Sequence, residues 1–292
     1  MLVCCGLVTL DVVQVVDRLP APDEKVVARS VSATFGGPAA NAAATAVALG
    51  TPTRLVAAVG SGQLAAMVRA ELTDAGVELV DVAAGTDGQP AVSTVLVTWA
   101  TGERAVASTN ALGFGSATPD REALPVPGQG DVLLLDGHLP QVALPLAGAA
   151  RDRGALVVLD GGSWKESTPD VLALCDAVVL SADFRVPGSD DAEVLDAVAA
   201  LGPGGRLPFV ARTSGPGPVD VLRAGERTSI AVPRAARVVD TLGAGDVVHG
   251  AFAAWLERGA SPSVALERAV EVATRSVEHT GARGWIDAPP QR

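Results

Sequence analysis

The chain has 292 residues, of which 48% are hydrophobic and 19% are charged, and its formal net charge at pH 7 is −11. This composition is typical of a soluble globular protein and excludes a disordered or fibrous one. The acidic balance disfavours nucleic acid and anionic membrane surfaces as partners, because both are negatively charged.

The N-terminal segment Met1–Val16 is apolar, but it has no basic residue before its core and it contains Asp11. It therefore lacks the pattern of a signal peptide, and we interpret it as one buried strand. No run of the chain reaches the roughly 18 apolar residues that a membrane-spanning helix needs. The three cysteines, with Cys4 next to Cys5, form neither a metal-ligand spacing nor a disulfide framework. We expect a cytoplasmic protein with reduced thiols.

Short apolar runs alternate with helical patterns along most of the chain, as they do in a mostly parallel sheet covered by helices on both faces. The predicted strands are Leu2–Val8, Arg54–Val59, Asp131–Leu135, Ala155–Leu159, Ala177–Leu180 and Leu207–Ala211. The predicted helices, with apolar residues three and four apart, are Ala42–Leu49, Leu64–Ala75, Gln141–Arg153, Ala192–Leu201 and Ser263–His279. Left-handed caps are expected after several of these helices, at Gly76, Gly154, Gly202 and Gly281. Because α/β folds of this length commonly form one unit, we expect a single domain over residues 1–292.

Two segments break this rhythm. Val26–Thr34 alternates between apolar and polar residues, and Ala91–Thr98 followed by Glu103–Ser108 has the pattern of a hairpin around Thr101-Gly102. Neither segment leads directly into a crossover helix. We therefore predict a small second sheet, built from segments near 11–34 and 89–108, that acts as a lid.

The glycine-rich turn Asp240–Asp246 opens onto an apolar helical stretch and is the strongest functional signal in the sequence. Backbone N–H groups at a helix start attract anions, and Gly243 and Gly245 would let them approach a phosphate. We expect Gly245 to tolerate no side chain, because its N–H must reach the phosphoryl oxygens and because the turn would use a backbone conformation that other residues avoid. The carboxylate of Asp246 could accept the proton of an attacking hydroxyl while these N–H groups stabilise a transferred phosphoryl group. The alternative is an ordinary glycine turn followed by an acidic residue in the first turn of a helix.

A second motif, Phe35-Gly36-Gly37-Pro38-Ala39-Ala40-Asn41, also leads into a predicted helix. Its glycine pair permits close backbone approach, and the Asn41 amide offers both a donor and an acceptor to a polyol. Taken alone, the motif is more typical of a plain connection between a strand and a helix.

Together the two motifs resemble the paired signatures of the ribokinase, or PfkB, family of carbohydrate kinases, and the resemblance extends over nearly the whole chain. It implies a ribokinase-like three-layer α/β sandwich, with a mostly parallel central sheet of about eight strands and a small β-sheet lid over the sugar. It also implies ATP and a small sugar as substrates, Mg²⁺ as cofactor, a monovalent cation such as K⁺, and a homodimer formed through the lid.

The resemblance assigns roles to residues of both motifs. It implies that Asp246 is the catalytic base and that Gly243, Ala244 and Gly245 form the anion hole. The residues expected to hold the hydroxyls of the substrate are Asp11, Gly36, Gly37 and Asn41.

The nucleotide side departs further from the family pattern. A turn at Thr213, Gly215 and Gly217 falls where the family contacts the nucleotide, and Gly281-Ala282-Arg283 is similar to its late segment near the adenine and the monovalent cation. A surface cap is the competing interpretation of the latter. Where the family has Asn-x-x-Glu near Mg²⁺, this chain has Ser181-Ala182-Asp183-Phe184. Either Asp183 is the metal ligand, or the metal is held differently.

Three alternatives to a kinase for neutral sugars stay open. A nucleoside kinase needs an aromatic platform, which Phe35 or Trp99 would have to supply because aromatic residues make up only 3% of the chain. Phosphorylation of an already anionic sugar would need a cationic clamp, for which Lys25, Arg29 and Arg104 in the predicted lid are candidates. A non-catalytic sugar or nucleotide sensor on the same fold would explain the altered metal segment.

Overall fold

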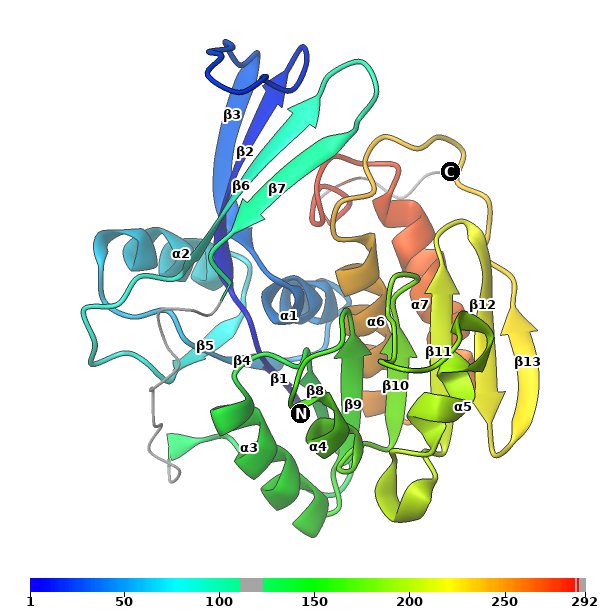
Figure 1. Ribbon diagram of the computed structural model, residues 1–292. Helices are drawn as coiled ribbons and strands as arrows, with labels where there is room; N and C mark the ends of the chain where they lie inside the picture. Colours follow the sequence, from blue (N-terminus) through cyan, green and yellow to red (C-terminus); the bar gives the residue numbers. More distant parts are fainter. Residues whose placement is uncertain (111–122, 287, 289–292) are drawn as a thin grey trace.

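The computed structural model describes residues 1–110, 123–286 and 288. Within them, a nine-stranded sheet with the order β13-β12-β11-β10-β9-β8-β1-β4-β5 forms the centre of the molecule (Figure 1). Its parallel strands are β1 (Leu2–Cys5), β4 (Thr53–Ala57), β5 (Glu78–Asp81), β8 (Val132–Leu135), β9 (Leu156–Gly161), β10 (Ala177–Leu180) and β11 (Phe209–Ser214). The antiparallel strands are β12 (Gly217–Arg223) and, at the edge of the sheet, β13 (Glu226–Ile230).

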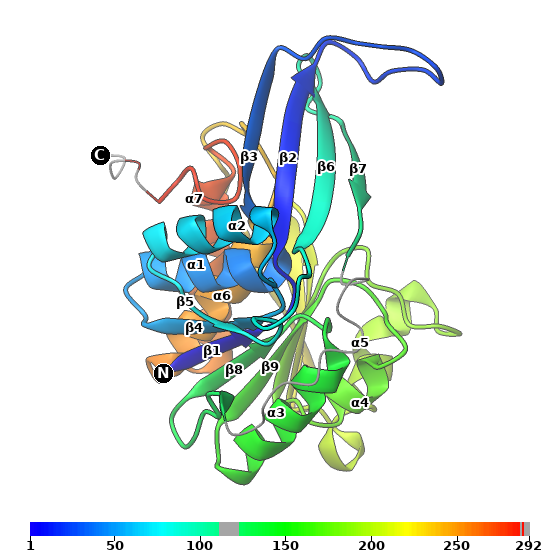
Figure 2. The ribbon, with the colours of Figure 1, turned by 90° about the vertical axis from the view of Figure 1, so that its left-hand side faces the viewer.

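Helices cover both faces of this sheet, as the view in Figure 2 shows from the side. One face carries α1 (Pro38–Ala48), α2 (Gln63–Asp74), α6 (Ala244–Glu257) and α7 (Pro262–Ser276). The other face carries α3 (Pro140–Asp152), α4 (Thr168–Leu172) and α5 (Val194–Ala199). Successive side chains of a strand point to opposite faces, so Leu2 and Cys4 belong to one core while Val3 and Cys5 belong to the other. The predicted three-layer α/β fold is confirmed.

A separate four-stranded sheet, with the order β3-β2-β6-β7, projects from one edge of the body (Figures 1 and 2). Its strands are β2 (Thr9–Val16), β3 (Ser30–Gly36), β6 (Ala91–Thr98) and β7 (Arg104–Ser108). Strand β2 lies at its centre, antiparallel to β3 and parallel to β6. The predicted hairpin of β6 and β7 is confirmed.

The prediction of one strand over Met1–Val16 is wrong. Strand β1 ends at Cys5 in the large sheet, and β2 begins at Thr9 in the small sheet. Gly6 marks the break, because a Cβ at this position would collide with the carboxylate of Asp136. The N–H of Leu7 donates to that carboxylate over 2.7 Å, which anchors the crossing between the two sheets.

The predicted glycine caps are partly correct. Gly76 and Gly154 follow α2 and α3 with φ values of 72° and 79°, in the left-handed region that glycine favours. Gly202 does not, since its φ is −70°, and a Cβ there would collide with the backbone of Leu207. Gly281 is left-handed, but it lies in a loop beyond the end of α7. In the part of the chain that the structure describes, no helix is long and apolar enough to cross a membrane.

Candidate active site

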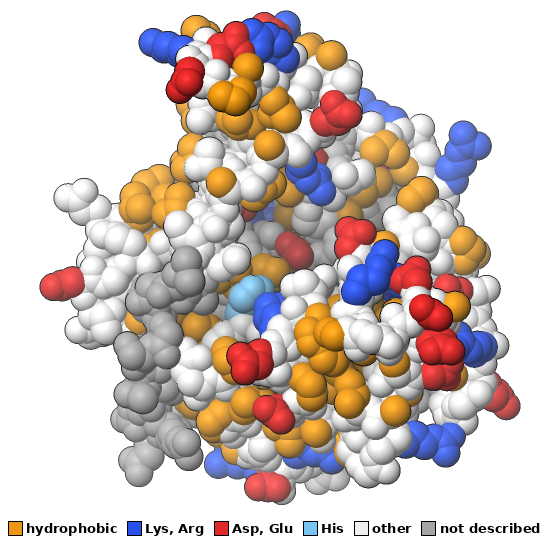
Figure 3. All heavy atoms as spheres, in the orientation of Figure 1, with side chains coloured by type: hydrophobic (Ala, Val, Ile, Leu, Met, Phe, Trp, Pro, Cys, Tyr) orange, Lys and Arg blue, Asp and Glu red, His pale blue; other side chains and the backbone are white. Residues whose placement is uncertain are grey.

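A cleft of about 830 Å³ lies between the small sheet and the carboxyl edge of the large sheet, and Figure 3 shows it as a hollow below the projecting strands. This edge is the usual ligand position in open α/β sheets. The small sheet contributes mainly hydroxyl and carboxylate groups to the lining, from Thr9, Asp11, Ser32, Thr34, Ser93 and Ser108. Such a wall can donate hydrogen bonds to a polyhydroxylated ligand and accept them from it.

The start of α6 forms the opposite wall. Gly243 is its N-cap residue in the left-handed conformation, with φ 74° and ψ 5°, and Asp246 lies in its first turn. Val247 is the first residue whose N–H bonds back to Gly243, so the N–H groups of Gly245 and Asp246 precede the intrahelical ladder. These N–H groups can donate hydrogen bonds to an anion in the cleft.

The backbone constraint that the sequence assigned to Gly245 belongs to Gly243. Gly245 has helical geometry, and a Cβ placed there meets no atom within 4 Å. A Cβ on Gly243 would collide with the Cβ of Ala282, besides requiring the unfavourable positive φ. The turn therefore does use a left-handed backbone conformation, but at Gly243 and not at Gly245.

Asp240 fixes this turn and was not singled out from the sequence. One of its carboxylate oxygens accepts from the N–H of Leu242 over 2.8 Å, and the other accepts from the N–H of Gly281 over 2.8 Å. The first contact is an Asx turn, for which an aspartate two residues ahead of a turn amide is a recognisable signal. The second ties the turn to the C-terminal loop, where Ala282 packs on Gly243.

Close packing of α1 on α6 brings Asn41 beside Asp246. Gly250 permits this approach, because a Cβ at that position would collide with the backbone of Ala42. The Asn41 side chain is buried, and its Nδ2 donates to Oδ2 of Asp246 over 2.7 Å. The two sequence motifs thus meet in one site.

Asp11 enters the cleft from β2 beside the glycine pair. Thr9 Oγ1 donates to Asp11 Oδ1 over 2.6 Å. A Cβ on Gly36 would collide with the Asp11 carboxylate, so this glycine provides space for the acid. Gly37 has φ 95°, and a Cβ there would approach the carbonyl oxygen of Leu7 to 2.5 Å. The four residues that the sequence assigned to the substrate therefore lie together, and Asp11, Gly37 and Asn41 line the cleft.

Two buried carboxylates at the carboxyl ends of neighbouring strands have opposite environments. Burial would raise the pKa of Asp136, but the neighbouring His138 and the backbone N–H groups of Leu7 and His138 outweigh it and lower that pKa. For Asp160, burial, followed by the charge of Asp136, raises the pKa to about 8. We therefore treat Asp160 as a neutral acid at pH 7.

His249 supports this assignment. Its Nε2 lies 2.9 Å from the carbonyl oxygen of Val179, which can only accept, so Nε2 carries the proton. Burial lowers the pKa of His249, which keeps the ring neutral and leaves a lone pair on Nδ1. This nitrogen lies 3.2 Å from Oδ2 of Asp160, in reach of the carboxylic acid proton. His249 is 3% exposed.

Asp160→Asn is therefore expected to retain turnover within a few-fold of wild type and to change the pH dependence of stability. The folded wild type keeps the Asp160 proton up to about pH 8, whereas the unfolded chain loses it near the ordinary value of about 4. The folded state thus binds more protons between these values, so wild-type stability falls as pH rises, by at most about 1.4 kcal/mol per pH unit. The variant lacks this pH dependence. Melting curves at pH 5 to 8 should therefore show the Tm of Asp160→Asn rising relative to the wild-type Tm as the pH increases. A constant Tm difference would mean that Asp160 is ionised throughout.

Arg283 makes contacts that the sequence did not predict. It was grouped with the adenine side or with a surface cap, but it is half-buried and lines the cleft on the side of the small sheet. Its Nη1 donates to Asn41 Oδ1 over 2.5 Å, and its Nη2 donates to Thr34 Oγ1 and to the carbonyl of Phe35. A single arginine in a glycine-rich loop carries no local signal for contacts with residues near position 40.

His138 and Lys165 complete the lower rim of the cleft, from the loops after β8 and β9. His138 Nδ1 lies 3.2 Å from Asp136 Oδ1. Lys165 was not singled out from the sequence.

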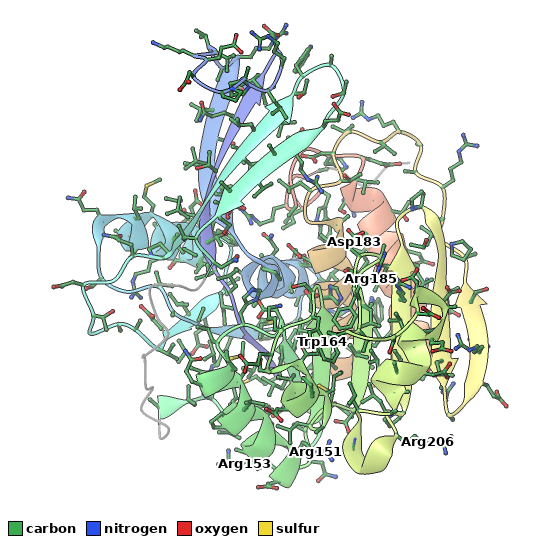
Figure 4. The ribbon with its side chains drawn as sticks, viewed as in Figure 1. Arg151, Arg153, Trp164, Asp183, Arg185 and Arg206 are labelled. Carbon is green, nitrogen blue, oxygen red and sulfur yellow. The ribbon has the colours of Figure 1, made fainter. Side chains whose placement is uncertain are left out.

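The residues expected on the nucleotide side lie in two separate places. Ala282 lines the cleft, whereas Thr213, Gly215 and Gly217 lie at the end of β11 and outside this lining. Asp183 is exposed beyond the end of β10, next to Arg185 (Figure 4). Phe184 is buried and packs edge-on against Trp164, with ring centroids 6.0 Å apart. The segment after β10 therefore presents one exposed carboxylate and one core residue.

Neither aromatic residue considered as a platform for a nucleobase is available to stack. Phe35 is 2% exposed, and the Arg283 guanidinium lies 3.5 Å from its ring centroid. Trp99 is 66% exposed at the far end of β6, and it carries Arg29 over its ring. The candidate clamp residues Lys25, Arg29 and Arg104 do not line the cleft either.

Comparisons with known proteins agree with this geometry. The model of a family described as "pfkB family carbohydrate kinase" matches residues 1–288. The ribokinase of Arabidopsis thaliana is 25% identical over 302 residues, covering 100% of this chain and 79% of that protein. An ATP-dependent ribose-1-phosphate kinase of Halopiger xanaduensis is 29% identical over 297 residues, covering 98% and 93%. The solved structure of Giardia lamblia ribokinase superimposes with a TM-score of 0.80 at 19% identity, covering 98% of this chain and 95% of that one. This last likeness concerns the fold alone.

Proposed function

The chain belongs to the pfkB family of carbohydrate kinases and is an ATP-dependent carbohydrate kinase; on this premise, we propose that it phosphorylates a hydroxyl of a small neutral sugar with Asp246 as general base. The observation that carries the proposal is the position of the Asp246 carboxylate. It lies at the anion-binding start of α6 and faces a wall of hydroxyl groups across the cleft.

The reaction follows from these positions. Asp11 and Asn41 hold hydroxyls of the sugar, and Asp246 accepts the proton of the attacking hydroxyl. The sugar oxygen forms a bond to the γ-phosphorus as the bond from phosphorus to the β-phosphate oxygen breaks, so ADP leaves with that electron pair. The N–H groups at the start of α6 stabilise the negative charge on the transferred group.

Magnesium is the expected cofactor of such a reaction, but the described residues do not fit a protein-built magnesium site. Asp183, the ligand expected from the sequence, is exposed and lies outside the cleft lining. Across residues 1–110 and 123–286, no group of three or more His, Cys, Asp or Glu side chains could hold a metal ion. We propose that Mg²⁺ enters with ATP, whose phosphates commonly supply its ligands. A need for a monovalent cation such as K⁺ stays a prediction, checked by replacing K⁺ in the assay.

The electrostatics of the cleft favour a neutral acceptor. Asp11 and Asp246 line the cleft, and Glu71 lies behind Arg283. An anionic sugar would meet these carboxylates, and the positive charge of Arg283 is already balanced by them. The similarity to a ribose-1-phosphate kinase makes a sugar phosphate the first competitor to test.

ADP release should therefore be measured with ribose, several hexoses, ribose-1-phosphate and inosine. We expect the highest kcat/KM with a neutral sugar and no turnover in the Asp246→Asn variant, which excludes a contaminating kinase. Turnover only with ribose-1-phosphate or inosine would refute the substrate class. Binding of sugar and ATP without turnover would indicate a sensor.

Asp11→Ala is expected to raise the KM for the sugar at least tenfold while the KM for ATP stays near wild type. A carboxylate that accepts hydrogen bonds from sugar hydroxyls acts mainly in binding, and charge-assisted hydrogen bonds of this kind contribute roughly 1.5–3 kcal/mol. Asn41→Ala should act in the same direction. Steady-state kinetics with each substrate varied separately measure both constants. A change confined to the KM for ATP would place Asp11 on the wrong side of the reaction.

The small sheet is proposed to act as a lid and as the surface of a homodimer in the cytoplasm. Several of its apolar side chains are exposed, including Val31 at 67% and Val106 at 55%. The two valines lie on the opposite edge strands β3 and β7, and exposed apolar side chains on an edge strand are candidate contacts for a second copy. Light scattering on wild type and on Val31→Lys would test the dimer.

A further inference from the structure

Arg283 connects the C-terminal loop to the strand and helix that hold the acceptor side of the cleft. Its guanidinium donates to Asn41 Oδ1 over 2.5 Å, to Thr34 Oγ1 over 2.6 Å and to the Phe35 carbonyl over 2.7 Å. Glu71 stabilises the same corner, because its Oε2 accepts from Thr34 Oγ1 and from the N–H of Phe35. The guanidinium therefore has a fixed position behind Asn41.

This position determines which way the Asn41 amide points. The two ends of an amide are similar in shape, so neighbouring donors and acceptors decide its orientation. A guanidinium can only donate, so the Asn41 atom that faces Arg283 must be the oxygen. The NH₂ group of Asn41 then faces the other way, where its Nδ2 lies 2.7 Å from Asp246 Oδ2.

We propose that Arg283 is a positioning residue that acts through Asn41: by donating to Oδ1, it holds the Asn41 NH₂ group against the carboxylate of Asp246. The inference rests on the proposed function, since it concerns the residue assigned there as the general base. Arg283 itself touches neither the reacting hydroxyl nor the phosphate in this role.

The contact matters because the surroundings of Asp246 otherwise favour its protonated form. Burial raises the pKa of Asp246 most, whereas the hydrogen bond from Asn41 lowers it. An ionised Asp160 or Asp136 would raise this pKa further, and a protonated His249 would lower it. These groups come from β9, α1, α6 and β8, and Arg283 faces them from the C-terminal loop. A reversed Asn41 amide would present its oxygen to the carboxylate, which would favour a proton on Asp246 and disable the base at neutral pH.

An alternative role for Arg283, binding an anionic group of the substrate, is disfavoured by its surroundings. Burial lowers the pKa of Arg283, and the carboxylates of Glu71, Asp11 and Asp246 oppose that change. The guanidinium charge is therefore compensated within the protein, and three of its N–H groups are already engaged.

The test combines Arg283→Gln with Asn41→Ala in a double-mutant cycle. Glutamine can accept as well as donate, so the Asn41 amide loses its fixed orientation. We expect Arg283→Gln to shift the rising limb of the kcat against pH profile upward by about one pH unit and to lower kcat several-fold at pH 7. In the Asn41→Ala background, the same substitution should produce a clearly smaller shift, because only the charge of Arg283 is then lost. Arg283→Lys, which remains a donor-only cation, should restore most of the wild-type profile.

A second readout does not depend on the substrate. Carboxyl ¹³C NMR, with the Asp246 signal assigned from Asp246→Asn, should show the same upward shift in the Asp246 titration. Melting temperatures identify any variant that fails to fold. If Arg283→Gln does not fold, the pH profile and the Asp246 titration are measured on Arg283→Lys instead.

The outcomes separate the two proposals. Equal shifts with and without Asn41 would mean that Arg283 acts only through its charge, and an unshifted profile would mean that it does not act on Asp246. Either result overturns the positioning role while the base assignment stands, provided that Asp246→Asn is inactive. If Asp246→Asn keeps wild-type turnover, Asp246 is not the general base, and the positioning role of Arg283 is refuted as well.

Discussion

Asp246→Asn is expected to lower kcat by roughly a hundredfold or more while the KM for ATP stays near wild type, the usual range for loss of a general base. The amide has the shape of the carboxylate and can still accept the hydrogen bond from Asn41 Nδ2. It cannot accept a proton from the sugar hydroxyl at neutral pH. The fold should survive, because the substitution removes a charge that burial disfavours.

The wild-type pH profile gives the same prediction a second measurement. Because burial raises the pKa of Asp246, the base is ionised only above the range of an ordinary carboxylate, so kcat should rise with pH toward neutrality. The variant should lack this rise. Asp152→Asn, at the exposed end of α3, is the matched control and should behave as wild type. Undiminished turnover of Asp246→Asn would contradict the assignment of Asp246 as the general base.

Two glycines in one turn are expected to respond differently to added side chains, although both substitutions should abolish activity. Gly243→Ala should destabilise the fold, on the order of 1–3 kcal/mol, because φ is 74° and the new Cβ collides with Ala282. Gly245→Val should keep its Tm near wild type, since its Cβ meets no atom within 4 Å. Its side chain should instead obstruct the approach of phosphoryl oxygens to the N–H groups at the start of α6.

Melting curves and turnover, measured on both variants, distinguish a phosphate cradle from a structural turn. A folded and inactive Gly245→Val protein supports the cradle. A folded protein with normal turnover would mean that this segment of α6 does not contact the phosphoryl group.

Local periodicity predicted the body of the fold because its strands are buried on both faces and its helices are amphipathic. The run Ala177–Leu180 matches β10 to the residue, and Ala91–Thr98 matches β6. Strands β5 and β13 were missed because they are short edge strands, and β12 was missed with them because all three have charged residues at exposed positions. The continuous apolar run over Met1–Val16 concealed a change of sheet, which depends on the space that Gly6 leaves for Asp136.

The site was predictable where its functional residues stand in short sequence motifs. Asp246 and Asn41 each stand in a glycine-containing motif, and the structure brings them within a hydrogen bond. Arg283 and Asp160 were not predictable in this way, because their roles come from neighbours that are distant in sequence. The local environment of Asp160, which lacks hydrogen-bond donors, sets its protonation, and residue type alone does not reveal it.

The hydrogen bonds that hold the candidate site span most of the polypeptide, with Asn41 and Asp246 separated by 205 positions and Thr34 and Arg283 by 249. Contacts between such distant segments require loop closure and form late relative to local ones. Enzymatic activity should therefore return only with the slowest phase of refolding, after helical circular dichroism has recovered. Partly folded chains would position neither the sugar nor the phosphoryl donor for reaction. They would therefore not hydrolyse ATP during biogenesis.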